Sequence, residues 1–217
     1  MKRWLKRGII IIVSLAVLVI VWSFADAVLY KNEVREFVRD VEGIPLGAAE
    51  VQVQWIRTKY PVTTDVFSRS YYELANHPTN LQFCLLGRVA CVFPRKLLLQ
   101  DFGVDGSISL ENGRVERKKI SIGVNTSTGT GSFVSIEEAE TMANTDPTDV
   151  WLNNDPSFRV GKRGGLTQVR FTPAATQERR RAAYHLDFRC AWKWRWCKAA
   201  TDIVPELILP EPRGSIE

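Results

Sequence analysis

The most marked hydrophobic pattern is a run of 18 residues without a charge, Gly8 to Ala25, built mainly of Ile, Leu and Val. As a helix rising about 1.5 Å per residue, such a run spans roughly 27 Å, close to the thickness of a bilayer's hydrocarbon core. The pattern therefore predicts one transmembrane helix over residues 8–25.

Beyond this run the apolar residues become periodic. Apolar residues recur at i, i+3, i+4 and i+7, separated by charged residues, at Val34, Phe37, Val38 and Val41. This is the spacing of one face of an amphipathic helix. We expect residues 26–42 to continue the anchor as an amphipathic helix.

Alternation and turn-forming residues predict strands in the remainder of the chain. The expected strands are Glu50–Trp55, Gln168–Thr172 and a hairpin of Ser107–Glu111 with Arg114–Val124. Asn112-Gly113 is the clearest hairpin turn, because both residues tolerate the left-handed conformation that a tight turn needs.

Capping residues and prolines predict helices between these strands. The expected helices are Thr64–Asn76, Arg95–Phe102, Ser135–Asn144, Thr172–Tyr184 and Lys198–Val204. Interspersed helices and hairpins indicate the α+β class. We therefore expect residues 43–210 to form one mainly antiparallel sheet with flanking helices, followed by a frayed tail at 211–217.

The positions of the charged residues change what the net charge implies. Lys and Arg number 29 against 24 Asp and Glu, a formal charge of +5, yet Lys2, Arg3, Lys6 and Arg7 lie in a basic tag at residues 1–7. Cations before a span stay in the cytoplasm. The excess charge therefore indicates orientation rather than a nucleic-acid partner, and it places the C-terminal domain outside the cytoplasm, in the periplasm or the extracellular space.

The apolar segment has a second interpretation as a cleavable signal peptide. Ala25-Asp26-Ala27 fits the small-x-small pattern of a cleavage site. The apolar run is longer than the 7–15 residues usual in a signal peptide, and the helix pattern continues past it. We expect an uncleaved anchor, with a secreted domain after cleavage behind Ala27 as the alternative.

Four cysteines occur as two pairs with identical spacing, Cys84 with Cys91 and Cys190 with Cys197. In an exported domain such pairs indicate disulfides, and we expect each to close its own local loop. The spacing is unlike that of structural zinc ligands. No metal site and no cofactor are expected.

The most unusual stretch is a candidate binding surface in which tryptophans alternate with cations: Trp192, Lys193, Trp194, Arg195 and Trp196. In a strand the three rings would share one face. In a disulfide loop they would splay, with at least one exposed. The stretch fits core packing, binding to a protein or glycan, or contact with anionic lipid at a membrane surface.

Charged residues are segregated along the domain, with an acidic stretch between Glu137 and Asp155 and a basic one between Arg159 and Lys198. They can pair within the molecule or attract an anionic partner. No spacing typical of a catalytic site is present, and no catalytic residue is assigned. We expect a single-pass, membrane-anchored cell-envelope protein of non-catalytic binding or assembly type. The alternative is an exported hydrolase with a site that the spacing of residues does not reveal.

Overall fold

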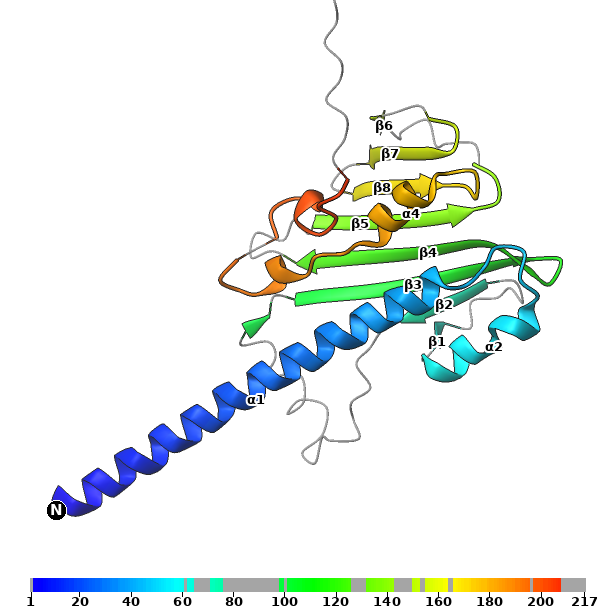
Figure 1. Cartoon of the computed structure of the whole chain (residues 1–217). Coiled ribbons are helices and arrows are strands. Elements are labelled where there is room, and N and C mark those ends of the chain that lie inside the picture. The colour runs from blue at the N-terminus through cyan, green and yellow to red at the C-terminus, as the bar shows by residue number, and fades with distance from the viewer. Residues whose placement is uncertain are drawn as a thin grey trace, which may run out of the picture.

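One helix, α1 (Lys2–Glu42), runs without a break through both the charge-free segment and the amphipathic segment. In this computed structural model, residues 2–60, 62–64, 71–75, 98–99, 101–125, 132–142, 150–152, 155–163, 166–195 and 197–207 are described. The N-terminal half of α1 extends away from the domain (Figure 1), and its apolar side chains from Ile9 to Val21 are exposed. The C-terminal half packs on the domain, with Val34, Phe37, Val38 and Val41 at most 5% exposed.

The strands belong to one sheet with the order β1-β2-β3-β4-β5-β8-β7-β6. Their bounds are β1 Val62–Thr64, β2 Tyr71–Ala75, β3 Asp101–Glu111, β4 Arg114–Asn125, β5 Ser132–Ala139, β6 Val150–Trp151, β7 Phe158–Arg163 and β8 Leu166–Phe171. Neighbouring strands are antiparallel except β5 and β8, which are parallel. The expected α+β class with a mainly antiparallel sheet is thus confirmed.

The predicted hairpin is confirmed at the centre of the sheet, between β3 and β4. Its turn residues Asn112 and Gly113 have φ of 52° and 72°, the left-handed region that Asn and Gly adopt most easily. Glu111 and Arg114 face each other across the turn. Local turn chemistry therefore fixes the register next to the turn, and a bulge between Ser109 and Leu110 shifts the register along the rest of the two strands.

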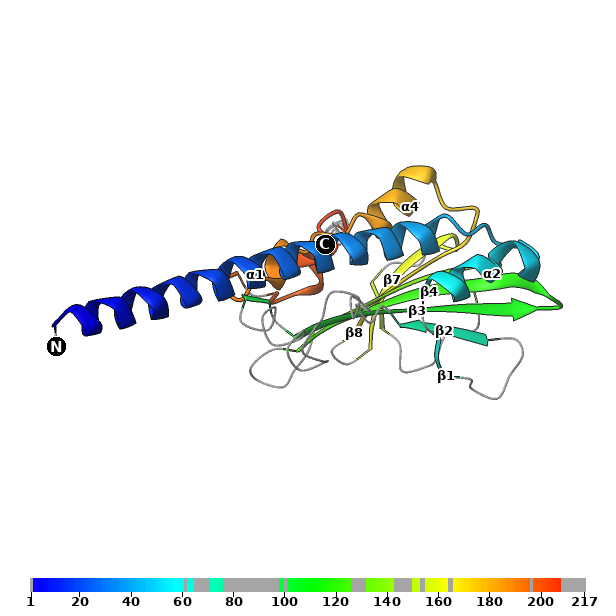
Figure 2. The same ribbon diagram turned by 90° about the horizontal axis from the view of Figure 1, so that it is seen from below.

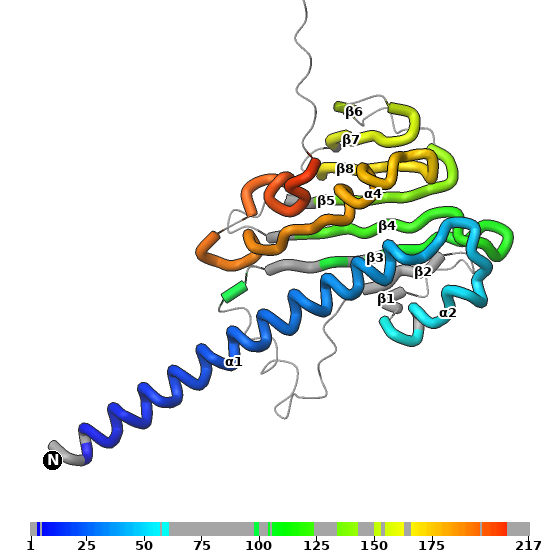
Figure 3. The backbone as a smooth tube through the Cα atoms, in the orientation of Figure 1, coloured from blue at the N-terminus to red at the C-terminus, as the bar shows by residue number. Residues whose placement is uncertain are grey.

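The helices cover one face of the sheet. Figure 2 shows α1, α2 (Glu50–Lys59) and α4 (Gln177–Tyr184) on the same side of the strands. The approach of α1 depends on Gly106 in β3, where an added Cβ would lie 2.6 Å from Cζ of Phe37. Phe37 in turn packs edge-to-face on Tyr60, with ring centroids 4.9 Å apart. The core residues thus come from both this helical layer and the sheet. The tube in Figure 3 shows the path of α1 across the strands β3 and β2.

The predicted strand at Glu50–Trp55 is wrong, because these residues belong to helix α2. The residues of this segment that are buried are Val53, Ile56 and Tyr60, which are spaced as one side of a helix. The amide of Ala49 also donates to Oε1 of Gln52 over 3.0 Å, a bond that satisfies one free N–H at the helix start. A short alternation of apolar residues fits both the period of a strand and the period of a helix. Here packing on the core favours the helix.

Two predicted helices are strands instead. Ser135–Asn144 was expected to be helical from a capping pattern, yet β5 occupies Ser132–Ala139 in the middle of the sheet. The helix expected at Thr64–Asn76 is wrong where the chain is described, since Thr64 ends β1 and Tyr71–Ala75 is β2. In both places pairing with strands distant in sequence overrides local helix signals.

Three further helix boundaries need correction. Asp101 begins β3, so the helix expected to end at Phe102 is wrong there, and residues 94–97 lie outside the described part. Helix α4 begins later than expected, with Thr176 as its N-cap. The last expected helix is only a short 3₁₀ turn, η3 (Ala200–Asp202).

Candidate functional site

A disulfide joins Cys190 to Cys197 and closes the local loop that the spacing predicted. Both cysteines are at most 9% exposed and belong to the hydrophobic core. The loop is entered by a 3₁₀ turn, η2 (Arg189–Ala191). The buried bond therefore holds the loop on the domain. The other expected pair, Cys84 with Cys91, lies outside the described residues.

The tryptophan stretch within this loop is a turn rather than a strand. The amide of Lys193 donates to the carbonyl of Leu98 over 2.8 Å, and the amide of Arg195 folds back to the carbonyl of Trp192 over 2.9 Å. As expected for a loop, one ring is exposed, with Trp194 at 59%. The rings of Trp192 and Trp194 do not splay, however, but stack with centroids 4.7 Å apart. The side chain of Trp196 lies outside the described part.

A third aromatic ring completes this stack from the other end of the sequence. Phe24, on α1, stacks on Trp192 with ring centroids 5.5 Å apart and planes 16° apart. Phe24 is also the second-last residue of the charge-free run that ends at Ala25. We name Phe24, Trp192 and Trp194 the aromatic stack. It fastens the disulfide loop to the helix at the level where the apolar segment ends.

Cations surround the aromatic stack. The Nζ atom of Lys31 lies 5.0 Å from the centroid of a Trp192 ring, within the range of a cation–π interaction. Burial lowers the pKa of Lys31, and the positive charge of Arg35 lowers it further, whereas Asp187 opposes both effects. Lys193 and Arg195 are exposed on the loop. The loop therefore presents one exposed ring beside two exposed positive charges.

The segregated acidic and basic stretches pair with each other inside the molecule. Glu137 lies 3.2 Å from Nε of Arg170, and Asp155 pairs with Arg179. Glu137 also lies 3.3 Å from Nε of Arg117, which is outside the basic stretch. The interpretation in which the two stretches pair internally is confirmed for these residues. Asp146 and Asp149, also in the acidic stretch, lie outside the described part.

Within the described part of the chain, the most deeply buried ion pair joins Lys118 of β4 to Glu138 of β5, with the charged atoms 2.9 Å apart and the side chains 1% and 2% exposed. Nζ of Lys118 also donates to the carbonyls of Glu42 and Ile44 over 2.6 Å each, at the end of α1 where helix carbonyls lack partners. Burial lowers the pKa of Lys118, and Glu138 opposes this. The local pattern that suggested a helix cap at Glu138 gave no sign of this contact.

Comparisons of the chain with family models, curated proteins and solved structures find no match. The structure itself defines a coarse class: an α+β domain that follows a long N-terminal apolar helix. By length and composition this helix is able to cross a membrane, and such a helix near the N-terminus fits a membrane anchor or a signal segment. The disulfide indicates an extracytoplasmic domain.

Proposed function

We propose that the chain is a single-pass, membrane-anchored cell-envelope protein of binding or assembly type, with its domain outside the cytoplasm. The observation that carries this proposal is the packing of the domain on residues that precede the alternative cleavage site. Ser23 and Ala27 are both 0% exposed, and Phe24 is part of the aromatic stack. Cleavage behind Ala27 would remove all three residues from the folded domain, which favours an uncleaved anchor.

Orientation follows from charge. The four cations of residues 1–7 favour the cytoplasmic side. The disulfide between Cys190 and Cys197 is stable in an oxidising compartment, which is where this orientation places the domain. Two independent features thus support the same topology.

The aromatic stack supports a contact between the domain and the membrane surface. Because Phe24 lies at the end of the apolar run, Trp192 and Trp194 lie at the level of the lipid headgroups, where tryptophan is enriched in membrane proteins. Lys193 and Arg195 are exposed next to them and can reach lipid phosphates. Of the occupants considered for this surface, anionic lipid therefore fits better than a glycan or a soluble protein.

Among the described residues, the side chains that line the cleft between α1 and α4 give more support to binding or assembly than to hydrolysis. Glu42 is the only carboxylate among its lining residues, beside three arginines. A hydrolase using acid and base carboxylates needs two that converge on the same cleft. This cleft does not provide them.

N-terminal sequencing of the protein purified from the membrane fraction tests the proposal, combined with extraction at alkaline pH. We expect the sequence to begin at Met1 or Lys2 and the protein to stay with the membrane. A sequence beginning at Val28, in protein released from the membrane, would establish the secreted domain instead. The variant Ala27→Leu, which blocks the small-residue cleavage pattern, would then retain the protein in the membrane.

A further inference from the structure

Burial along α1 follows a repeat of seven residues. When successive positions are lettered a to g, with Trp22 at position a, the residues of 22–42 that are buried on the domain occupy only positions b, c and f. They are Ser23, Ala27, Tyr30, Lys31, Val34, Phe37, Val38 and Val41. Every residue at positions a, d and g of this stretch is exposed. One side of the helix is thus used by its own domain, and the opposite side is left open.

The line through positions a and d forms the middle of this open side, and we name it the seam. Its alternating spacing of three and four residues is the spacing at which two helices pack in a coiled coil. Two turns of the apolar segment continue it with Leu15 and Leu18, which are exposed as well. The residues of the seam between 22 and 42 are Trp22, Ala25, Leu29, Asn32, Glu36 and Arg39.

The apolar part of the seam extends beyond the level of the aromatic stack. Leu29 is 55% exposed and lies five residues after Phe24, about 7.5 Å further along the helix. The headgroup layer is about 5–8 Å thick on each side of the hydrocarbon core. Leu29 is therefore an exposed aliphatic side chain at the outer limit of the lipid, where a protein partner would cover it better than acyl chains.

Asn32 is the next residue of the seam and is complementary to itself. Its amide carries both a donor and an acceptor, so two copies of Asn32 can pair across a two-fold axis. A single asparagine in an otherwise apolar seam fixes the register of two helices. Oδ1 of Asn32 accepts from Nη1 of Arg35 over 3.4 Å at the surface, and the amide nitrogen is the group that a second asparagine would receive.

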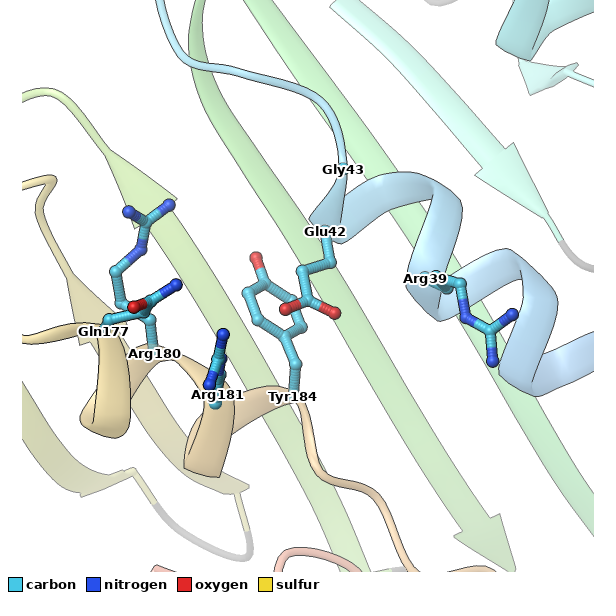
Figure 4. A pocket seen from close by; sticks show the side chains of 7 residues that line it. All are labelled: Arg39, Glu42, Gly43, Gln177, Arg180, Arg181 and Tyr184. Carbon is cyan, nitrogen blue, oxygen red and sulfur yellow. The ribbon is translucent and has the colours of Figure 1, made fainter.

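The charges at the end of the seam are complementary too. Glu36 and Arg39 occupy successive seam positions, so two parallel helices would place each Arg39 beside Glu36 of the other copy. Among the described residues Arg39 has no carboxylate in an ion pair with it. Figure 4 shows its guanidinium group pointing away from α4. Opposite charges would therefore meet twice across the axis, which favours this pairing over others.

From this pattern we infer that the seam binds a second copy of the chain, as a parallel dimer with two-fold symmetry. The inference rests on the uncleaved anchor of the proposed function, because one membrane holds all copies parallel and at the same depth. Equal residues then face each other, as a two-fold axis requires. Figure 2 shows α2 and α4 near the C-terminal end of α1, so these helices leave the membrane-proximal part of the seam open.

Oxidative crosslinking of the full-length protein in membranes tests the seam. Leu18→Cys and Leu29→Cys place a thiol on it, and both should form dimers that reductant dissolves, several-fold above the level of the unsubstituted chain. Ile20→Cys is the matched control, since Ile20 is at position f and is 58% exposed against 63% for Leu18. It should form no more dimer than the unsubstituted chain. Equal crosslinking at residues 18 and 20 would indicate random collision and overturn the inference.

A change of charge tests the pairing of Glu36 with Arg39. In the Leu29→Cys protein, Arg39→Glu places like charges across the seam and should lower the crosslinked fraction several-fold. Arg181→Glu, at an exposed arginine of α4, is the control and should leave it unchanged. An equal loss with both variants would overturn the inference.

Extraction of the same membranes at alkaline pH separates this inference from the proposed function. A chain that stays in the membrane but lacks the crosslinking pattern contradicts the dimer alone. A chain released from the membrane contradicts the anchor, and with it the basis for the parallel pair.

Discussion

Phe24 and Trp192 stack face to face with ring centroids 5.5 Å apart, although they lie near opposite ends of the chain. The contact joins the last part of the apolar segment to the disulfide loop, and Trp194 continues the stack outward with 59% of its surface exposed. The exposed ring is the part of the loop that a membrane surface would cover.

Lipid contact by Trp194 can be measured by fluorescence quenching. In vesicles containing brominated phosphatidylcholine, with Trp22→Phe as the parent to remove the signal from the span, we expect Trp194→Phe to reduce the quenched fraction. Trp55 on α2 is 45% exposed and lies at the other end of the domain, so Trp55→Phe serves as the control and should not reduce it. Equal quenching with and without Trp194 would contradict contact with the membrane.

The disulfide should stabilise the domain by closing a short loop. Replacing Cys190 and Cys197 together by Ser is expected to lower the free energy of unfolding by about 2–3 kcal/mol, because the unfolded chain regains the freedom of that loop. Urea unfolding in micelles measures this. Reductant added to the doubly substituted protein then reports on Cys84 and Cys91: a further loss of stability indicates their pairing, and no change argues against it.

The buried pair of Lys118 and Glu138 should be sensitive to the loss of one partner. Lys118→Met leaves a buried carboxylate with Arg180 as its other partner and also frees the carbonyls at the end of α1, so we expect a loss of about 3–5 kcal/mol. Arg180→Gln should cost less, since the side chain of Arg180 is 38% exposed. Chemical denaturation compares the two. A larger effect for Arg180→Gln would show that the buried lysine is not the main partner.

The close approach of α1 to β3 is tested at Gly106. An added methyl group would lie 2.6 Å from Cζ of Phe37, whose ring is held by Tyr60. We expect Gly106→Ala to destabilise the fold by about 1–3 kcal/mol, the usual cost of overpacking. Gly8→Ala, where an added methyl meets nothing within 4 Å, is the matched control.

A second variant distinguishes a steric clash from a general backbone effect at Gly106. If the clash is the cause, Phe37→Leu should make room for the methyl group, so the double variant should lose less stability than the sum of the two single changes. If the two losses of stability are additive, the clash between the methyl group and Phe37 is not the cause of the destabilisation.

Local sequence patterns predicted the structure correctly where the stabilising contacts join residues that are close in sequence. The stripe of Val34, Phe37, Val38 and Val41 predicted the helix and its buried side, and Asn112-Gly113 predicted the central hairpin. The spacing of Cys190 and Cys197 likewise predicted the short loop that their disulfide closes. In all three cases the required geometry extends over a few residues.

Other features depend on contacts between distant segments. Ser135 and Glu138 have the spacing of a helix cap, but Glu138 is held in a strand by Lys118 and Arg180, which no local window contains. The candidate sites likewise depend on contacts between segments that are distant in sequence. The tryptophan stretch was recognisable from its composition, whereas the contribution of Phe24 and the exposed seam of α1 required the fold.

The unbroken helix from Lys2 to Glu42 joins the proposed anchor rigidly to the domain. A shared helix transmits any tilt of the span directly to the domain, because no hinge separates them. Spans commonly tilt by about 20° to match the thickness of the bilayer, and over the roughly 26 Å from Asp26 to Glu42 such a tilt moves the end of α1 sideways by about 9 Å. Bilayer thickness would thereby set where the arginine-lined cleft stands above the membrane.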